Sequence, residues 1–192
     1  MLPIHPLPPC PSCGGPDAEP VAPDSGVLAC RGCGRFWAAV DPTNRPELPE
    51  AAADPAAFAA GLVRRYRLTR DDLVVEVGSG GGERLRAVKG LGPRALGVEP
   101  ELRVMAKAFH AGVDTIGTRF CAGIGEYVAR RYGPARVLVV RGLRAVGCEP
   151  ADLVAAAAGC LVPGGVLVAE VLIGGVARLV ELHPVAPARI AA

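Results

Sequence analysis

Short apolar runs alternate with amphipathic stretches through residues 54–192. Runs of four or five successive apolar residues are typical of parallel strands, which are buried on both faces. The pattern predicts strands at residues 73–77, 95–98, 113–116, 136–140 and 166–172, with one more at 176–183. Strands that alternate with helices predict a parallel sheet with right-handed crossovers. We therefore expect an α/β, Rossmann-like domain that ends after about five or six strands and binds its ligand at their carboxyl ends.

Helical periodicity fills the intervals between these strands. The first helix begins at Asp54, a typical N-cap residue, with Pro55 in its first turn. Its apolar residues recur at helical spacing and predict a buried face, whereas its arginines are expected to face water. The apolar set is Phe58, Leu62, Val63 and Tyr66, and the arginines are Arg64, Arg65 and Arg67.

Four further helices are expected, at residues 83–89, from Pro100 onward, at 124–131 and at 150–159. In the helix that follows Pro100, apolar residues recur at helical spacing and predict a face directed at the core. This inward set is Leu102, Met105, Ala106 and Phe109.

Residues 1–40 have no helical periodicity and carry two pairs of cysteines, Cys10 with Cys13 and Cys30 with Cys33. Two such pairs, with sixteen residues between them, predict a structural zinc site with four thiolate ligands. The alternatives are unpaired thiols or two local disulfides. We expect a small zinc ribbon behind a proline-rich lead-in, then a linker at residues 41–53 and the α/β domain at residues 54–192.

The expected first strand runs into a glycine loop, Gly78-Ser79-Gly80-Gly81-Gly82, and Glu99 follows the expected second strand. Glycines let a backbone turn sharply and approach a ligand closely, and a carboxylate at the neighbouring strand tip can hold ribose hydroxyls. Glu83 occupies the position of the third fingerprint glycine, and its charge disfavours a pyrophosphate there. The pattern favours an adenosine ligand without phosphates, S-adenosylmethionine. The alternatives are a purely structural turn and a solvated Glu99.

Composition narrows the choice of partner. Hydrophobic residues make up 51% and charged residues 21% of the chain, and the formal net charge is only +2. Aromatic residues are 4%, which disfavours a base-stacking surface, so we do not expect nucleic acid as a partner. The longest apolar run, residues 153–162, is half of the roughly 20 residues of a membrane span. The N-terminus does not read as a secretory signal, so we expect a cytoplasmic protein without a membrane partner.

Together the glycine loop, Gly97-Val98-Glu99-Pro100 and residues 161–167 resemble class I S-adenosylmethionine-dependent methyltransferases. More narrowly, the cysteine pairs, which end in Cys30-Arg-Gly-Cys33-Gly34, and the stretch Val74-Val75-Glu76-Val77-Gly78-Ser79 resemble the zinc-ribbon sugar C-methyltransferases of bacterial antibiotic biosynthesis. Residues 112–115, Phe120 and residues 168–171 fit that family too. The resemblance covers residues 10 to about 172. It implies S-adenosylmethionine and structural Zn²⁺ as cofactors, with Glu76, Gly78, Ser79, Gly80, Glu99 and Pro100 contacting the former.

The chain also departs from this family. The family places an Asn and a His after the fourth strand, where residues 141–147 read Arg-Gly-Leu-Arg-Ala-Val-Gly. Arg141 and Arg144 are therefore candidates to clamp an anionic substrate, or they belong to a solvated loop. The family also carries a large further domain with a Tyr/His/Glu catalytic group. Glu181 and His183 alternate onto one strand face, either as an acid–base pair or as an exposed terminal pair.

We therefore expect a methyltransferase acting on a small biosynthetic intermediate, a sugar or another natural-product precursor. The alternative is a diverged member without methyl transfer, doing other small-molecule chemistry or serving as an accessory subunit. A ribosomal RNA methyltransferase is disfavoured by charge and composition. Because a short sheet leaves an edge to cover, we expect a homodimer or a partner protein that completes the site.

Overall fold

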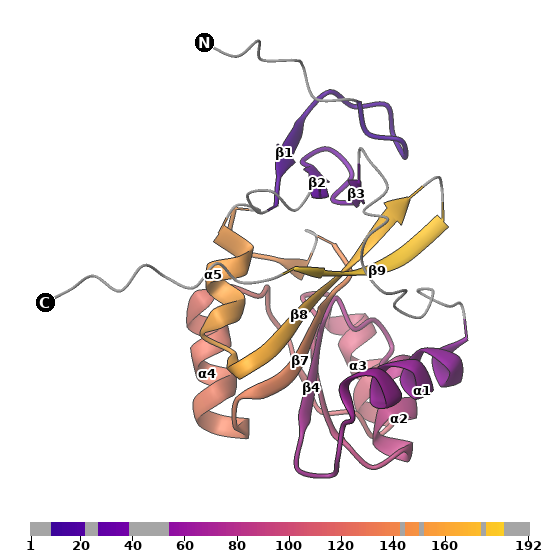
Figure 1. The fold of residues 1–192 in the computed structure, drawn as a ribbon, viewed down its shortest axis with the longest axis vertical. Coiled ribbons are helices and arrows are strands. Elements are labelled where there is room, and N and C mark those ends of the chain that lie inside the picture. The colour runs from indigo at the N-terminus through magenta and orange to yellow at the C-terminus, as the bar shows by residue number, and fades with distance from the viewer. Residues whose placement is uncertain are drawn as a thin grey trace, which may run out of the picture.

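The computed structural model describes residues 9–21, 27–38, 54–142, 145–149, 152–173 and 176–182. Five parallel strands form its centre, in the spatial order β6, β5, β4, β7, β8. Figure 1 shows β4, β7 and β8 of this set side by side. They are β4 (Leu73–Val77), β5 (Arg94–Val98), β6 (Thr115–Ile116), β7 (Ala135–Val140) and β8 (Leu161–Ile173). The order reverses beside β4, which places the ligand crevice at the carboxyl ends of β4 and its neighbours. The predicted Rossmann-like α/β fold is confirmed.

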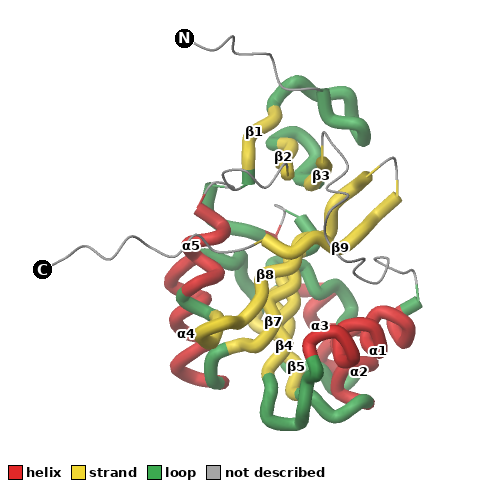
Figure 2. The backbone as a smooth tube through the Cα atoms, viewed as in Figure 1, coloured by secondary structure: helices red, strands yellow, loops and turns green. Residues whose placement is uncertain are grey.

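Helices cover both faces of this sheet (Figure 2). One layer holds α1 (Pro55–Tyr66), α2 (Glu83–Gly90) and α3 (Leu102–His110), and the other holds α4 (Ala122–Tyr132) and α5 (Leu153–Ala158). Successive strand side chains point to opposite faces, so β4 contributes to two cores. Val74 packs in the core that includes Phe58 of α1, whereas Val75 and Val77 pack in the core that includes Val128 of α4.

Helix α1 begins as the sequence predicts. The carboxylate of Asp54 accepts hydrogen bonds from the amides of Ala56 and Ala57, at 3.0 and 3.2 Å. The expectation that Arg65 faces water is wrong, because strand β9 (Val176–Leu182) lies within its reach. The guanidinium of Arg65 donates to Glu181 of β9 at 2.9 Å and ties the end of α1 to the sheet.

The predicted inward face of α3 is also wrong. Leu102 and Phe109 are 63% and 71% exposed, and Ala106 is exposed too. The helix instead contacts the core through Ala108, the one buried residue of α3. Ala108 lies so close to Gly82 that a methyl group on Gly82 would be 3.1 Å from the Ala108 Cβ. Because α3 packs this closely against the glycine loop, the bulky apolar residues of α3 point outward.

The N-terminal strands belong to the same sheet. β1 (Ala18–Pro20), β2 (Val27–Cys30) and β3 (Phe36–Ala38) are antiparallel to one another, and β3 then pairs in parallel with β8. On the same edge of β8, β7 pairs as far as Ala169 and β3 pairs at Val171 and Leu172. The ribbon therefore sits beyond the carboxyl end of β7, and Phe36 joins the core on the α4 side of the sheet.

Strand β8 is longer than predicted. The expected Pro-Gly turn lies inside it, as an irregularity that pairs Ala135 with Leu161 but Val137 with Val166. The expected last strand is β9, and it pairs antiparallel with β8 on the edge opposite β7. The sequence pattern does not show this bulge because it depends on the pairing with β7.

Substitutions at Gly82 and Gly112 separate two costs of adding a side chain: overpacking against α3 and strain in a left-handed backbone. Both have a left-handed φ, +79° and +77°, but a Cβ would meet Ala108 and Val113 only at Gly82. We expect Gly112→Ala to lower the free energy of unfolding by about 1 kcal/mol. Gly82→Ala is expected to cost about 1–3 kcal/mol more, because it also overpacks the contact with α3. Denaturant unfolding measures both, and equal losses would contradict the close seat of α3.

Candidate functional site

Three left-handed glycines shape the loop between β4 and α2. Gly78, Gly80 and Gly82 have φ of +78°, +59° and +79°, conformations that L side chains rarely adopt. The amide of Gly78 donates to the carbonyl of Val98 at 2.8 Å, which fixes the loop to the end of β5. Gly82 allows the close helix packing that the third fingerprint glycine provides, although Glu83 occupies the fingerprint position.

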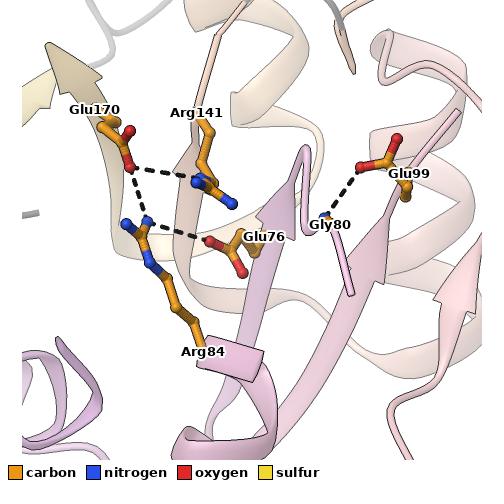
Figure 3. A network of polar contacts seen from close by, with 6 residues as sticks. All are labelled: Glu76, Gly80, Arg84, Glu99, Arg141 and Glu170. Atoms are coloured by element: carbon orange, nitrogen blue, oxygen red, sulfur yellow. Dashed lines mark hydrogen bonds and ion pairs between the residues drawn. The ribbon is translucent and has the colours of Figure 1, made fainter. Parts of the chain in front are cut away.

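The carboxylate of Glu99 bridges from the end of β5 to this loop (Figure 3). One oxygen accepts the amide of Gly80 at 3.0 Å, and the other accepts the amide of Glu101 at 3.0 Å. An ionised carboxylate has about four lone-pair positions, so each oxygen keeps capacity for a ligand hydroxyl. Glu99 therefore holds the loop and at the same time presents acceptors at the crevice between β4 and β5.

A cavity of about 1110 Å³ opens at the carboxyl ends of the strands. Four of the residues predicted to bind the cofactor or the substrate line it together, namely Gly78, Glu99, Pro100 and Arg141. Glu170 at the end of β8 lines it too. Pockets for small ligands are usually about 300–1,000 Å³, so this one is large enough for a nucleoside-sized ligand.

Alternating charges connect the strand ends beside this cavity (Figure 3). The guanidinium of Arg84 donates to Glu170 at 2.8 Å and lies 3.6 Å from the carboxylate of Glu76. Arg141 approaches the same Glu170 oxygen at 3.4 Å. Arg84 also lies over the ring of Phe58, 4.7 Å from its centroid, which holds the cation in place. Sequence reasoning missed Arg84 and Glu170, because 86 positions separate the two residues.

Glu76 is the buried member of this set, with 1% of its surface exposed. Burial raises the pKa of its carboxyl to about 7, although the charges of Arg141 and Arg84 oppose that shift. Neither carboxylate oxygen has a hydrogen-bond partner among the described residues, and the buried hydroxyl of Ser79 has none there either. Ser79 in the glycine loop and Glu76 in the strand before it thus have buried polar atoms without a partner, which a bound polar ligand or a water molecule would satisfy.

The four N-terminal cysteines meet in space. Their sulfur atoms all lie within 4.8 Å of one another, and the pairs Cys10–Cys33 and Cys13–Cys30 are 3.6 Å apart. A tetrahedral zinc with bonds of about 2.3 Å requires sulfur–sulfur edges of about 3.8 Å, whereas a disulfide requires about 2.05 Å. The cysteines are free, and the cluster fits a tetrahedral metal. The amide of Cys33 also points at the Cys30 sulfur, at 3.4 Å.

The remaining predicted site residues lie elsewhere. Glu181 on β9 is hydrogen-bonded to Arg65 and to the hydroxyl of Tyr66, at 2.9 Å each, and it does not line the cavity. Arg144 and His183 lie outside the described residues. Among the helices that the structure describes, none is long and apolar enough to cross a membrane.

Comparison with known proteins gives one curated relative at high significance. No family model matches the chain. The chain is 37% identical over 109 residues to the C-methyltransferase NovU of Streptomyces niveus. The match covers 57% of this chain and 26% of that protein. The predicted resemblance to C-methyltransferases is thereby confirmed. The matched part spans about a quarter of the relative's length.

Solved structures with a related arrangement include two methyltransferases. One is the S-adenosylmethionine-bound CalS10, an amino pentose methyltransferase from Micromonospora echinaspora, with a TM-score of 0.47, 23% identity and coverage of 64% of this chain and 53% of that one. The other is the sugar N-methyltransferase KedS8 from Streptoalloteichus, with a TM-score of 0.48, 23% identity and coverage of 62% and 48%.

The raised pKa of Glu76 predicts a pH-dependent stability. Between about pH 4.5 and 7 the folded state keeps a proton that the unfolded chain has lost, so stability falls as pH rises through this window. We expect wild type to lose up to about 3 kcal/mol relative to Glu76→Gln between these limits. Denaturant unfolding at several pH values measures the difference. Glu126→Gln, at an exposed residue of α4, is the control, and parallel pH profiles for wild type and Glu76→Gln would contradict the prediction.

Proposed function

We propose that the cavity binds S-adenosylmethionine and that the chain takes part in methylating a small biosynthetic intermediate, a sugar or another natural-product precursor. The observation that carries the proposal is the bridge from Glu99 to the Gly80 amide, at the point where the strand order reverses. The identity to a C-methyltransferase over 109 residues supports it. Because the match spans a quarter of that relative, its activity enters here only as a proposal.

The residues around the crevice have different roles in binding the cofactor. The Glu99 carboxylate accepts hydrogen bonds from ribose hydroxyls, and Gly78, Ser79 and Gly80 let the backbone approach the ligand closely. Pro100 closes the wall beside Glu99. The cofactor supplies a methyl group on a positively charged sulfur, which an acceptor atom takes in an in-line displacement. Holding the acceptor in line is therefore the main task of the protein.

Arg141 and Glu170 occupy the acceptor side, at the ends of β7 and β8. Arg141, together with Arg144, is proposed to hold an anionic group of the acceptor. Glu170 is already paired with two arginines, Arg84 at 2.8 Å and Arg141 at 3.4 Å. Methylation at carbon requires a base that can take a proton from the acceptor. Glu181 and His183 are the proposed pair on this chain, although Glu181 already has partners on α1.

We propose that a second copy of the chain or a partner protein completes the site. Leu102 and Phe109 of α3 are exposed, and α3 lies beside β6, the two-residue strand at the edge of the sheet. An apolar helix face beside a sheet edge is a surface that association would cover.

A diverged protein without methyl transfer is the second candidate, and the position of Arg141 favours it. A guanidinium nitrogen of Arg141 lies 3.7 Å from the place that a Cβ on Gly80 would occupy. A cation beside this loop opposes a sulfonium ligand and favours its neutral analogue, S-adenosylhomocysteine. A methyltransferase should turn over an acceptor, whereas the diverged protein should bind the ligand without methylating any acceptor.

Titration calorimetry with S-adenosylmethionine tests the first candidate. We expect saturable binding by wild type and a loss of roughly 10- to 100-fold in affinity for Glu99→Ala, because a hydrogen bond to a charged group contributes about 1.5–3 kcal/mol. Glu126→Ala, on the exposed surface of α4, serves as the matched control. Thermal unfolding of each variant separates lost contacts from lost folding. No heat from folded wild-type protein would refute the proposal.

We also propose that Cys10, Cys13, Cys30 and Cys33 bind a structural Zn²⁺. Trp37, the single tryptophan of the chain, is buried in a small cluster with Cys10, Leu28 and Cys30, so its fluorescence reports on this metal. We expect a chelator to shift Trp37 emission to the red and to make four thiols reactive, with both effects reversed by added zinc. Protein that is metal-free as isolated and shows neither change would contradict the zinc site.

A further inference from the structure

The second cysteine knuckle, residues 30–35, is part of the cavity wall. Arg31, Gly32, Cys33, Gly34 and Arg35 line the same cavity as Gly78 and Glu99. A ribbon with a purely structural role would not need to face the ligand. The knuckle instead lies against Gly142, next to Arg141, and closes the cavity there.

Three separate contacts hold the knuckle in this position. The backbone of β3 pairs with β8 from Phe36 to Val171, directly after Glu170. The carbonyl oxygen of Gly34 lies 2.8 Å from the place that a Cβ on Gly142 would occupy, so the two backbones touch. Arg31 forms ion pairs with Glu19 of the ribbon and with Glu149, which follows the end of β7.

The shape of the knuckle is set by the cysteine cluster. The amide of Gly34 donates to the carbonyl of Cys30 at 2.8 Å, and the amide of Cys30 donates to the carbonyl of Arg35 at 2.9 Å. The face of the ribbon that carries the sulfur atoms has a small apolar cluster of Cys10, Leu28, Cys30 and Trp37, whereas Ala29 and Phe36 pack into the main core. A metal bound to the four sulfur atoms would therefore stabilise the knuckle on the face where apolar packing is smallest.

We infer that the second cysteine knuckle is a wall of the small-molecule site, and that metal binding at the cysteines and ligand binding in the cavity stabilise one another. The identity of the ligand rests on the proposed function, whereas the coupling rests on the contacts above. Arg35 is exposed to the cavity and forms no ion pair within the described part of the chain. It is the ribbon residue placed to contact the acceptor.

Thermodynamic linkage makes the coupling measurable from both sides. If zinc raises the affinity for the cavity ligand by some factor, the ligand raises the affinity for zinc by the same factor. Coupling between sites commonly amounts to about 5- to 150-fold. Because the knuckle supplies a whole wall, we expect a change of about tenfold or more.

Hydrogen exchange without any small molecule tests the contact itself. We expect zinc removal from the full chain to speed amide exchange in residues 9–38 and also at Gly142, Glu149, Val171 and Leu172, which the ribbon contacts. Faster exchange confined to residues 9–38 would overturn the inference. This measurement does not depend on the identity of the ligand.

Calorimetry with S-adenosylmethionine, on zinc-loaded and chelated protein, tests the coupling. We expect chelation to weaken binding at least about tenfold. Equal affinity in both forms would overturn the inference and leave the proposed function standing. Failure of the zinc-loaded protein to bind would instead refute the proposed function, and the exchange data would then decide the inference alone.

Gly142→Ala perturbs the cavity wall without perturbing the metal site. Its Cβ would push against the Gly34 carbonyl without touching a cysteine. We expect unchanged zinc content with S-adenosylmethionine binding weakened about fivefold or more. Gly92→Ala is the matched control, because Gly92 also has a left-handed φ, +116° against +150°, but nothing lies within 4 Å of its Cβ. Wild-type affinity in folded Gly142→Ala protein would contradict the inference that the knuckle is a wall of the small-molecule site.

Discussion

Two guanidinium groups, those of Arg141 and Arg84, offset part of the cost of burying the carboxyl group of Glu76 at the centre of the sheet, and Arg84 is the one that also joins the surrounding elements. Glu76 lies in β4, where every residue is buried, and an uncompensated charge there would be costly. Arg84 reaches it from α2, binds Glu170 on β8 and rests on Phe58 of α1. The interaction thus joins two strands and two helices at the sheet end where the cavity opens. Removing Arg84 would leave Arg141 as the one cation beside Glu76 and Glu170 within the described residues, which is why the arrangement depends on Arg84.

Local patterns sufficed for the elements that are buried on all sides. The run that became β4 and the glycine loop after it were predictable, because continuous apolar residues and clustered glycines have few other uses in a chain. The pattern of α3 predicted an apolar face but not what covers it. Ala108, a small residue outside that face, makes the close contact with Gly82, and Leu102 remains exposed. The size of a contact residue, more than its hydrophobicity, decided how this helix packs.

The site was predictable where its residues follow strand ends. Gly78, Glu99, Pro100 and Arg141 meet around one cavity because the carboxyl ends of parallel strands lie at the same edge of a sheet. Cysteine spacing similarly predicted the cluster of four sulfur atoms. The ion pairs of Arg84 and the place of the ribbon were not predictable, since both join residues far apart in the chain. No local pattern indicates that β3 pairs with β8 or that Arg35 faces the cavity.

Strand β8 has consequences for how the molecule reaches its native state. It gathers β7 and β3 on one edge and β9 on the other, and its pairing with β3 joins Phe36 to Val171 across most of the chain. Such distant pairings are slow, because the entropy of closing a long loop is lost before any contact is gained. During synthesis the ribbon emerges long before its docking strand exists. A cysteine knuckle that forms early must therefore remain undocked, with its sulfur atoms close together, until β8 and β9 have been made and provide the strand edge with which the ribbon pairs.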